Sequence, residues 1–493
     1  MCILERSGTT GVVRTVIWII VIICLGLVQL GLFGTLVFLE NRNPSKTVAW
    51  LIVLMLLPLL GFLLYLVLGS SVRKRRLFKH KHLEGDRLES IVQRQLQQLS
   101  ADEVLFGYDV EQKQRLVRLL LNNAKSPVTN NNNFQVLTDG QQKFDALFKE
   151  LEKATDHIHL MYYIFKDDQI GKDTQQLLMR KRAEGVEVRV MVDGLGSHGT
   201  KSSFFQEMRD VGIKVAVFFP VRFPFLSNRL NFRNHRKIVV VDGKVGLLGG
   251  MNIGDEYLSR DPKLGYWRDT HLLVRGDSVQ VMQRTFLNDW FFVTREKITA
   301  AKYYPRAERV GNMLVQIVPS GPDAEFESIR QMFFAACATA ERRIFLETAY
   351  FIPDDSIIMA LKTAALSGVD VRLIVQGVPE YKLTYWASRS YFSEMLDAGV
   401  KIYQYQKGIM HAKVLLVDDE IAVLGSANFD IRSFLLNFEI GAFFYSREFA
   451  RRLEGDFEQD LQNSLQVELA SFRNRPLPER LKESGARLLS PLL

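Results

Sequence analysis

Two stretches of the 493-residue chain decide its fold: HRKIVVVDGKVGLLGGMN at residues 235–252 and HAKVLLVDDEIAVLGSAN at residues 411–428. Each begins with a histidine and a lysine two positions apart, continues through four apolar residues to an aspartate, and ends in glycine and asparagine. Alternate residues of a strand share a face, so the histidine and the lysine of each stretch are predicted to point the same way. The similarity of the two stretches indicates an internal duplication.

Three further pairs of segments match in the same order along the chain. They are IHLMYYIF from Ile158 with IFLETAYFI from Ile344, AEGVEVRVMVDG from Ala183 with ALSGVDVRLIVQG from Ala365, and VGIKVAVF from Val211 with AGVKIYQY from Ala398. The matched segments lie roughly 180 residues apart, which indicates duplicated lobes rather than the units of a solenoid. Helical patterns at 141–154, 171–184 and 201–210 alternate with short apolar runs, as is typical of α/β layers around a mixed or parallel sheet.

The amino-terminal part of the chain is mostly apolar. Residues 15–39 carry no charge, and a second apolar run covers 47–69 after the turn signal Asn43-Pro44. Both runs are long enough to cross a bilayer as helices, so we expect a two-helix transmembrane hairpin. Lysine and arginine are concentrated after Gly69, which favours a multi-pass protein of the cell membrane with the following lobes on the cytoplasmic side.

The expected organisation has four parts. They are a membrane hairpin at 1–70 with spans at about 15–39 and 47–69, a basic juxtamembrane and helical linker at 71–133, lobe 1 at 134–300, and lobe 2 with C-terminal helices at 301–493. An insert at 221–232 and the segment from Tyr381 are rich in aromatic residues, which would either touch the bilayer or fill the core.

Composition limits the partners and cofactors. The net charge of +8 suggests an anionic partner, which includes nucleic acid, phosphoesters and an anionic membrane. Cys2, Cys24 and Cys337 are far apart in sequence, which excludes a disulfide framework or a cysteine-based zinc site. Each histidine of the twin motifs has a cationic lysine as its neighbour, so we expect no metal and no other cofactor.

The twin motifs suit chemistry on a phosphodiester. One imidazole can attack phosphorus and form a covalent phosphohistidine, and the other can protonate the leaving alkoxide and later deprotonate the acceptor. Lys237 and Lys413 would stabilise the charge on the non-bridging oxygens without a metal. The candidate phosphate-binding residues are Asn252, Asn428 and Ser426. Asp269 and Glu439 stand at similar places downstream and are expected to orient the two histidines.

These paired motifs resemble the phospholipase D superfamily, in which two such lobes build one active site. The resemblance covers roughly residues 134–460, and NFRNHRK, YWRDTH, GSANFDIRSF and the amino-terminal hairpin are most similar to bacterial cardiolipin synthases. It implies transfer of a phosphatidyl group from one phosphatidylglycerol to another, giving cardiolipin and glycerol without nucleotide or metal. It also implies that His235 is the nucleophile and His411 the acid and base. The implied catalytic set is His235, Lys237, Asp242, His411, Lys413 and Asp418.

Several alternatives stay open from the sequence. Asp242 and Asp418 would take part in the chemistry or have an orienting or structural role. Water in place of the second alcohol would make the chain a lipid hydrolase, and another alcohol would make it a different head-group-exchanging phosphatidyltransferase. A nuclease and a membrane scaffold without activity fit less well, because the chain has apolar spans, no recognisable nucleic-acid module and two intact motifs. We therefore expect phosphatidylglycerol and anionic membrane lipids as partners and no nucleic acid; the oligomeric state is open.

Overall fold

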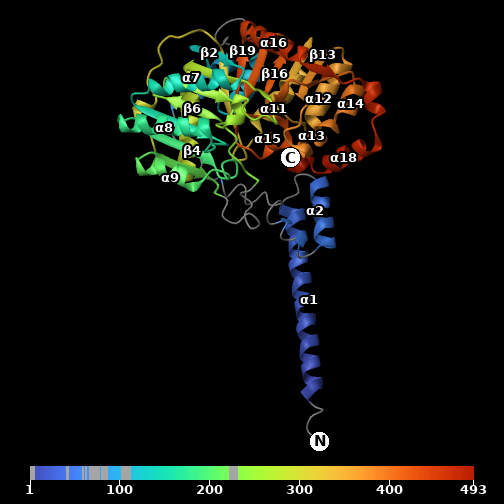
Figure 1. Ribbon diagram of the computed structural model, residues 1–493. Helices are drawn as coiled ribbons and strands as arrows, with labels where there is room; N and C mark the ends of the chain where they lie inside the picture. The colour runs from blue at the N-terminus through green and yellow to red at the C-terminus, as the bar shows by residue number, and fades with distance from the viewer. Residues whose placement is uncertain are drawn as a thin grey trace. The chain divides into compact units, whose positions relative to one another are not determined.

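The computed structural model describes residues 6–39, 44–57, 60–61, 64–65, 78, 87–101, 113–220 and 231–493 (Figure 1). The chain forms two compact units. The first comprises Met1–Lys79 and Phe223–Asn231, and the second comprises His80–Arg222 and Phe232–Leu493. The basic cluster that the sequence places after Gly69 and most of the aromatic insert at 221–232 lie outside the described residues.

The first unit contains two apolar helices, α1 (Arg6–Leu39) and α2 (Pro44–Leu56). They pack against one another, and Gln29, the one strongly polar residue of the first apolar run, donates its side-chain N–H to the carbonyl of Leu54 at 2.9 Å. Within the described residues, one helical stretch, Val13–Gly31, is long and apolar enough to cross a bilayer, and the apolar stretch Thr47–Leu56 is shorter. The described part of the chain therefore contains one candidate span, which is typical of a membrane-associated protein.

The second unit is built on two sheets, one in each lobe. The first sheet has the spatial order β2 (Asn132–Leu137), β9 (His271–Gly276), β7 (Val245–Gly249), β6 (Ile238–Val241), β3 (His157–Tyr162), β4 (Glu187–Asp193), β5 (Lys214–Phe218). The second has the order β1 (Val128–Thr129), β10 (Val315–Ser320), β19 (Glu439–Tyr445), β17 (Ile421–Gly425), β16 (Val414–Val417), β11 (Arg343–Glu347), β13 (Asp370–Gln376), β14 (Lys401–Tyr405), β20 (Ser464–Gln466). Apart from the edge strands β1 and β20, the two orders match strand for strand, which confirms the duplication.

Helices cover the sheets, as the green and orange lobes of Figure 1 show. Those of the first lobe are α7 (Gly140–Glu152), α8 (Gln169–Ala183), α9 (Ser202–Asp210) and α10 (Ser278–Thr294); the second has α11 (Ser328–Ala338), α12 (Asp355–Leu366), α13 (Lys382–Arg389), α14 (Phe392–Asp397) and α16 (Arg447–Gln462). Helix α10 contacts strands of the first sheet and β10 of the second, so it packs between the lobes. Each lobe has its own apolar core. The α/β class expected from the sequence is confirmed.

Two helices before the lobes belong structurally to the second lobe. Helices α5 (Arg87–Ser100) and α6 (Gln114–Asn123) bury Val92, Val117 and neighbouring apolar residues in its core. Gln95 exchanges two hydrogen bonds with the backbone of Val128, at 2.8 and 2.9 Å. This part of the predicted linker is thus packed against the core of the second lobe.

In each lobe, the direction of the strands places the His-x-Lys motif at the carboxyl edge of the parallel strands. Strands β3, β4 and β5 are parallel, and β6 runs antiparallel to β3, so the start of β6 lies at the carboxyl edge of the parallel strands. The start of β16 lies at the corresponding edge of β11 and β13. Ligands of α/β proteins bind at such edges, and His235 and His411 each precede one of these strands by three residues.

The segment from Tyr381 divides between surface and core. Tyr381 and Leu383 are exposed, whereas Tyr391 and Phe392 are buried in the core of the second lobe. Part of the segment therefore fills the core, one of the two roles that the sequence left open, and the exposed residues precede or begin α13.

Candidate active site

Short backbone bridges join the lobes directly beside the two motifs. The N–H of His235 donates to the carbonyl of Phe438 at 2.9 Å, and the N–H of Phe438 donates to the carbonyl of Arg233 at 2.8 Å. On the other side, β8 (Tyr266–Arg268) pairs in parallel with β15 (Gly408–Met410), and the N–H of His411 donates to the carbonyl of Arg268 at 2.7 Å. Each histidine is therefore attached through its main chain to the opposite lobe.

The bridges exchange carboxylates between the lobes. Nδ1 of His235 lies 3.0 and 3.1 Å from the two carboxylate oxygens of Glu439, which belongs to the second lobe. Nδ1 of His411 lies 2.6 Å from Oδ2 of Asp269, which belongs to the first lobe. A carboxylate at Nδ1 fixes the proton there and leaves Nε2 with its lone pair. The structure thus pairs each histidine with a carboxylate from the other half, a crossing that the sequence does not specify.

Burial and neighbouring charges together decide the protonation of the two histidines and of their two carboxylates. Burial lowers the pKa of His235 to about 4, against the opposing effect of Glu439, and it lowers the pKa of His411, with Lys413 adding to the effect and Asp269 opposing it. Burial alone would raise the pKa values of Glu439 and Asp269, but the neighbouring histidines and lysines lower them. At neutral pH the site therefore holds two neutral imidazoles beside two ionised carboxylates.

The two motif lysines lie beside their histidines. Nζ of Lys237 donates to the carbonyl of His235 at 2.7 Å, and Nζ of Lys413 lies 3.0 Å from Nδ1 of His411. Burial lowers the pKa of Lys237 to about 7 and lowers that of Lys413, in both cases against neighbouring carboxylates. Lys413 also contributes to the low pKa of His235, so the second lobe's cation is close to the first lobe's histidine. An anion that entered between them would meet two lysines.

The hydrogen bonds of Asp242 and Asp418 favour the structural role that the sequence left open over a part in the chemistry. Each follows a four-residue strand that begins at the site and lies five residues beyond its lysine, about 16–17 Å along an extended chain. Asp242 accepts hydrogen bonds from the backbone N–H groups of 155, 156 and 157, and Asp418 accepts them from 341, 342 and 343. Both have left-handed backbones, with φ of 52° and 53°. They tie the far end of β6 to β3 and of β16 to β11, a structural role.

Replacing Asp242 with alanine tests that role. We expect the free energy of unfolding to fall by about 2–4 kcal/mol, because three amides lose their acceptor and alanine is strained at positive φ. The activity per folded molecule should stay within about threefold of the parent, well short of the loss caused by removing a general acid or base. Denaturant unfolding in detergent and kcat below the melting range measure the two effects.

The Asp242 variant also has a pH signature. The pKa of Asp242 is lowered: burial opposes the shift, but the bonds from Thr155, Asp156 and His157 outweigh it. Its stabilisation is therefore present above the pKa of an unfolded aspartate and is lost as the pH falls through the lower folded value. The variant should lack this part of the acid-induced loss of stability. A folded variant with kcat as low as that of a histidine variant would contradict the structural role.

The three candidate phosphate-binding residues have other contacts. Asn252 donates to the hydroxyl of Tyr257 at 2.7 Å and accepts from the N–H of Ile164 at 3.1 Å, so its amide braces the first lobe. The Ser426 hydroxyl donates to the carboxylate of Glu439 and helps to hold it. Asn428 has a buried Oδ1 for which the described residues provide no partner. Of the three, only Asn428 retains an unused buried polar atom.

Gly250 of the first motif stands where the second motif has Ser426, and this difference has a geometric cause. A Cβ at Gly250 would lie 2.1 Å from Oδ1 of Asp269. The shorter aspartate reaches its histidine by occupying the space that a serine side chain would take, whereas the longer Glu439 leaves room for Ser426 and bonds to it. The carboxylate that contacts each histidine is therefore positioned by a different pair of residues in the two halves: Gly250 with Asp269, and Ser426 with Glu439.

Four contacts of the site go beyond the sequence analysis. The rings of Tyr163 and His235 lie 5.0 Å apart between centroids, and so do those of Trp267 and His411. Asn437 donates to Glu439 at 3.2 Å, and Arg236 donates Nε to the Glu439 carbonyl at 2.9 Å. Arg236 stands between the motif histidine and lysine, where the second lobe has Ala412. This difference between the two motifs is the one feature of the sequence that could have indicated an arginine that bridges the lobes.

Among the described residues, no group of three or more His, Cys, Asp or Glu side chains could hold a metal ion.

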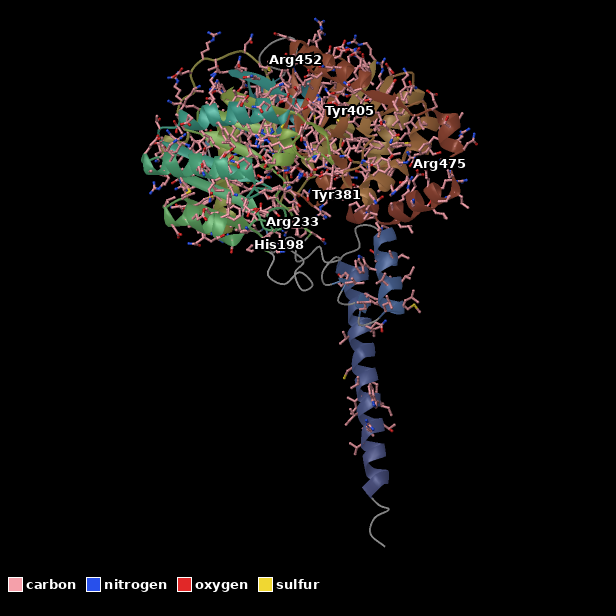
Figure 2. All side chains as sticks on the ribbon, in the orientation of Figure 1. His198, Arg233, Tyr381, Tyr405, Arg452 and Arg475 are labelled. Atoms are coloured by element: carbon pink, nitrogen blue, oxygen red, sulfur yellow. The ribbon has the colours of Figure 1, made fainter. Side chains whose placement is uncertain are left out.

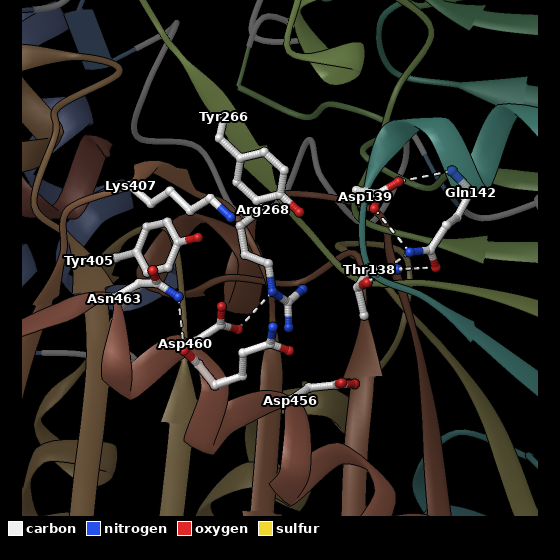
Figure 3. A pocket seen from close by; sticks show the side chains of 11 residues that line it. Thr138, Asp139, Gln142, Tyr266, Arg268, Tyr405, Lys407, Asp456, Asp460 and Asn463 are labelled. Carbon is white, nitrogen blue, oxygen red and sulfur yellow. Dashed lines mark hydrogen bonds and ion pairs between the residues drawn. The ribbon is translucent and has the colours of Figure 1, made fainter.

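A polar cavity of about 250 Å³ lies on the other face of β8 (Figure 3). Tyr266 and Arg268 line it, whereas Trp267 and Asp269 face His411, as strand alternation requires. The guanidinium of Arg268 donates to Asp460 at 2.7 Å there, and it also donates to the backbone carbonyl of Asp269 at 2.8 Å. Arg268 thus anchors the strand that presents Asp269.

Two duplicated α/β lobes whose His-x-Lys motifs share carboxylates across one interface define a phospholipase D-like protein. Comparison with known proteins gives the family. The model described as "Cardiolipin synthase, PLD-like domain" matches residues 147–290 and 334–461, and the model described as "Phospholipase_D-nuclease N-terminal" matches residues 30–70. The chain belongs to the cardiolipin synthase family of phospholipase D-like proteins.

Curated relatives match almost the whole chain. It is 45% identical over 457 residues to the cardiolipin synthase of Geobacillus sp. (strain WCH70), covering 92% of this chain and 90% of the relative. It is 44% identical over 464 residues to cardiolipin synthase 2 of Bacillus anthracis, covering 94% of this chain and 90% of the relative. A crystal structure of phosphatidylserine synthase from Haemophilus influenzae Rd KW20 shares the fold, with a TM-score of 0.59, 16% identity, and coverage of 77% of this chain and all of that one.

Proposed function

We propose that the chain is a cardiolipin synthase that moves a phosphatidyl group from one phosphatidylglycerol to the glycerol head group of another. The observation that carries this proposal is the crossed pairing of His235 with Glu439 and of His411 with Asp269. It supplies two oriented imidazoles, one from each lobe, with lysines beside them. Such a set suits a double displacement on phosphorus.

In the first step Nε2 of His235 attacks phosphorus. A P–N bond forms, the P–O bond to glycerol breaks, and His411 gives its proton to the leaving oxygen. The low pKa of His235 supports it as the nucleophile, because a neutral imidazole keeps its lone pair. A bound phosphodiester adds negative charge next to His411, which raises the pKa of this imidazole toward the protonated form that an acid needs.

In the second step His411 takes the proton of the incoming hydroxyl, the new P–O bond forms and the P–N bond breaks. Lys237 and Lys413 stabilise the non-bridging oxygens in both steps. The same residues serve hydrolysis if water replaces the alcohol, and head-group exchange if another alcohol does. Exclusion of water from the covalent intermediate separates these outcomes.

Purified enzyme with phosphatidylglycerol as the sole lipid tests the function. The expected products are cardiolipin and glycerol in equal amounts, with no added nucleotide and with phosphatidic acid as a minor product. A requirement for a nucleotide-activated lipid would overturn the proposal, and phosphatidic acid as the main product would make the chain a hydrolase.

The amino-terminal unit supports a membrane location for this reaction. We infer a multi-pass anchor at 1–70, with spans at about 15–39 and 47–69 and the lobes at 134–300 and 301–493 on the cytoplasmic side. The apolar stretches of α1 and α2 and their packing on one another support this arrangement. Tethering raises the effective concentration of lipid at the site. The side of the membrane on which the lobes lie can be tested with single cysteines placed in the lobes. They are labelled with an impermeant thiol reagent in intact and in permeabilised cells, and labelling only after permeabilisation is expected.

The pH dependence of kcat/KM follows from His235, Lys237 and His411. His235 must be neutral to attack, so kcat/KM should rise with pH through about 4. Lys237 must be protonated to hold the phosphate and His411 must be protonated to act as the acid, so kcat/KM should fall again by about pH 7, and the lowered pKa of His411 moves this limb further toward acid pH. Bound phosphate raises the pKa of Lys237, so the alkaline limb of kcat should lie at higher pH than that of kcat/KM. Initial rates in mixed micelles between pH 4 and 9 measure both limbs; coincident alkaline limbs would contradict the role of Lys237.

A further inference from the structure

Glu380 is an acidic residue at the site that the mechanism above does not use. It follows the end of β13 by four residues, at the carboxyl edge of β11 and β13 where β16 begins after His411 and Lys413. Figure 2 labels the next residue, Tyr381, which is exposed and whose pKa is influenced by Tyr163 of the first lobe. Glu380 therefore lies at the junction of the two lobes.

One oxygen of Glu380 is held in place by the second lobe. The hydroxyl of Tyr350 donates to Oε2 of Glu380 at 2.6 Å. Tyr350 directly precedes β12 (Phe351–Ile352), which pairs with β18 (Phe429–Asp430) immediately after Asn428. The carboxylate is thus positioned by the same loops that close the second motif.

The hydroxyl of Tyr381, the next residue, also interacts with Glu380. The two oxygens of a carboxylate offer about four lone-pair sites, so Glu380 can still accept a further hydrogen bond. The charge of Glu380 reaches the catalytic groups, because it raises the pKa values of His411 and Lys413 against the effect of burial. A carboxylate beside the site of an anionic substrate is unfavourable unless hydrogen-bond donors surround it. The phosphate cannot be such a donor, but a hydroxyl can.

We propose that Glu380 binds the hydroxyl next to the reacting oxygen in the glycerol head group, and so selects vicinal diols as the alcohols that leave and enter. This inference rests on the proposed function. In phosphatidylglycerol the middle hydroxyl of the head group is adjacent both to the oxygen that leaves phosphorus and to the terminal hydroxyl that attacks it. One carboxylate beside His411 therefore serves both steps, as microscopic reversibility requires of a shared acid and base.

Competition between two alcohols tests the proposal. Enzyme in phosphatidylglycerol micelles receives equal concentrations of 1,2-propanediol and 1-propanol, which differ in the vicinal hydroxyl, and the two phosphatidyl alcohols are quantified from the same tube. Their ratio compares the acceptors and is independent of the donor step and of the amount of active enzyme. The parent should prefer the diol, and Glu380→Gln should lower the ratio by about tenfold or more, as expected for a hydrogen bond to a charged group.

Two further variants complete the experiment. Glu256→Gln is the matched control, because Glu256 is an acidic residue that is ion-paired with Lys166; its ratio should equal that of the parent. Tyr350→Phe frees the held oxygen and should lower the ratio by a smaller factor. A role of Glu380 in tuning His411 alone would slow both alcohols equally and leave the ratio unchanged.

The outcomes separate this inference from the proposed function. An active Glu380→Gln enzyme with the parent's ratio overturns the diol site while leaving cardiolipin formation intact. If Glu380→Gln has no measurable transfer, an unchanged ratio in Tyr350→Phe overturns it. A parent enzyme that transfers phosphatidyl groups to neither alcohol and makes no cardiolipin would instead refute the proposed function.

Discussion

Replacing His235 with alanine is expected to lower kcat by about 10⁴-fold or more, because the covalent route loses its nucleophile. Replacing His411 with alanine should cost about 10²–10⁴-fold, the usual contribution of a general acid and base. The two losses differ in their dependence on the leaving group. A phosphatidyl ester of p-nitrophenol needs no protonation on departure, so His411→Ala should release one burst of p-nitrophenol per site and His235→Ala should release none.

The controls follow from the position of the histidines. Both contact the opposite lobe through their backbone N–H groups, which alanine retains, so the interface between the lobes should persist. Unfolding temperature and vesicle binding should stay near those of the parent. A burst from His235→Ala together with none from His411→Ala would exchange the two roles, and full turnover by either variant would refute the two-histidine mechanism.

Replacing Glu439 with glutamine, or Asp269 with asparagine, is expected to lower kcat by about 10²–10⁴-fold. The amide removes the charge and can present an N–H to Nδ1, which moves the ring proton to Nε2 and removes the lone pair that attacks phosphorus. Because the pairs are crossed, Glu439→Gln in the second lobe should reproduce the loss of the burst that marks His235→Ala in the first. Asp269→Asn should instead retain the burst, as His411→Ala does.

Ser426→Ala provides the graded control for Glu439. It removes one hydrogen bond to the carboxylate but leaves the bond from Asn437 and the charge, so the loss in kcat should be about tenfold or less. Double-mutant cycles between Glu439 and His235 should be strongly non-additive, and those between Glu439 and His411 closer to additive. The reverse pattern would contradict the crossed pairing.

The duplication, the α/β class of the lobes and the candidate His-x-Lys motifs could be predicted from the sequence, because β-strands and their flanking turns leave local patterns. The way in which the two lobes pair with one another could not be predicted. It depends on isolated backbone bridges such as that between Asn234 and Phe438, and these residues show no recognisable sequence pattern. Asp269 and Glu439 were therefore recognisable as candidate orienting residues, but their partners were not.

The sequence left the role of Asp242 open for a related reason. Spacing along a strand says which residues share a face, but a side chain at the far end is also far from the site. Its positive φ and its three backbone donors arise only when β3 lies alongside β6. Glu380 was missed for the opposite reason, since it lies on a loop, distant in sequence from His411, and only folding brings the two near each other.

The exchange of carboxylates between the lobes has a consequence for ancestry. A single lobe holds a histidine without its own acid and an acid without its own histidine, so an ancestral single-lobe protein of this kind needed two copies to act. Fusion into one chain freed the copies to drift apart, and Gly250 with Asp269 and Ser426 with Glu439 record that drift. Neither half can be inherited as a working enzyme by itself, and expressing the two halves as separate polypeptides should restore turnover only when they assemble.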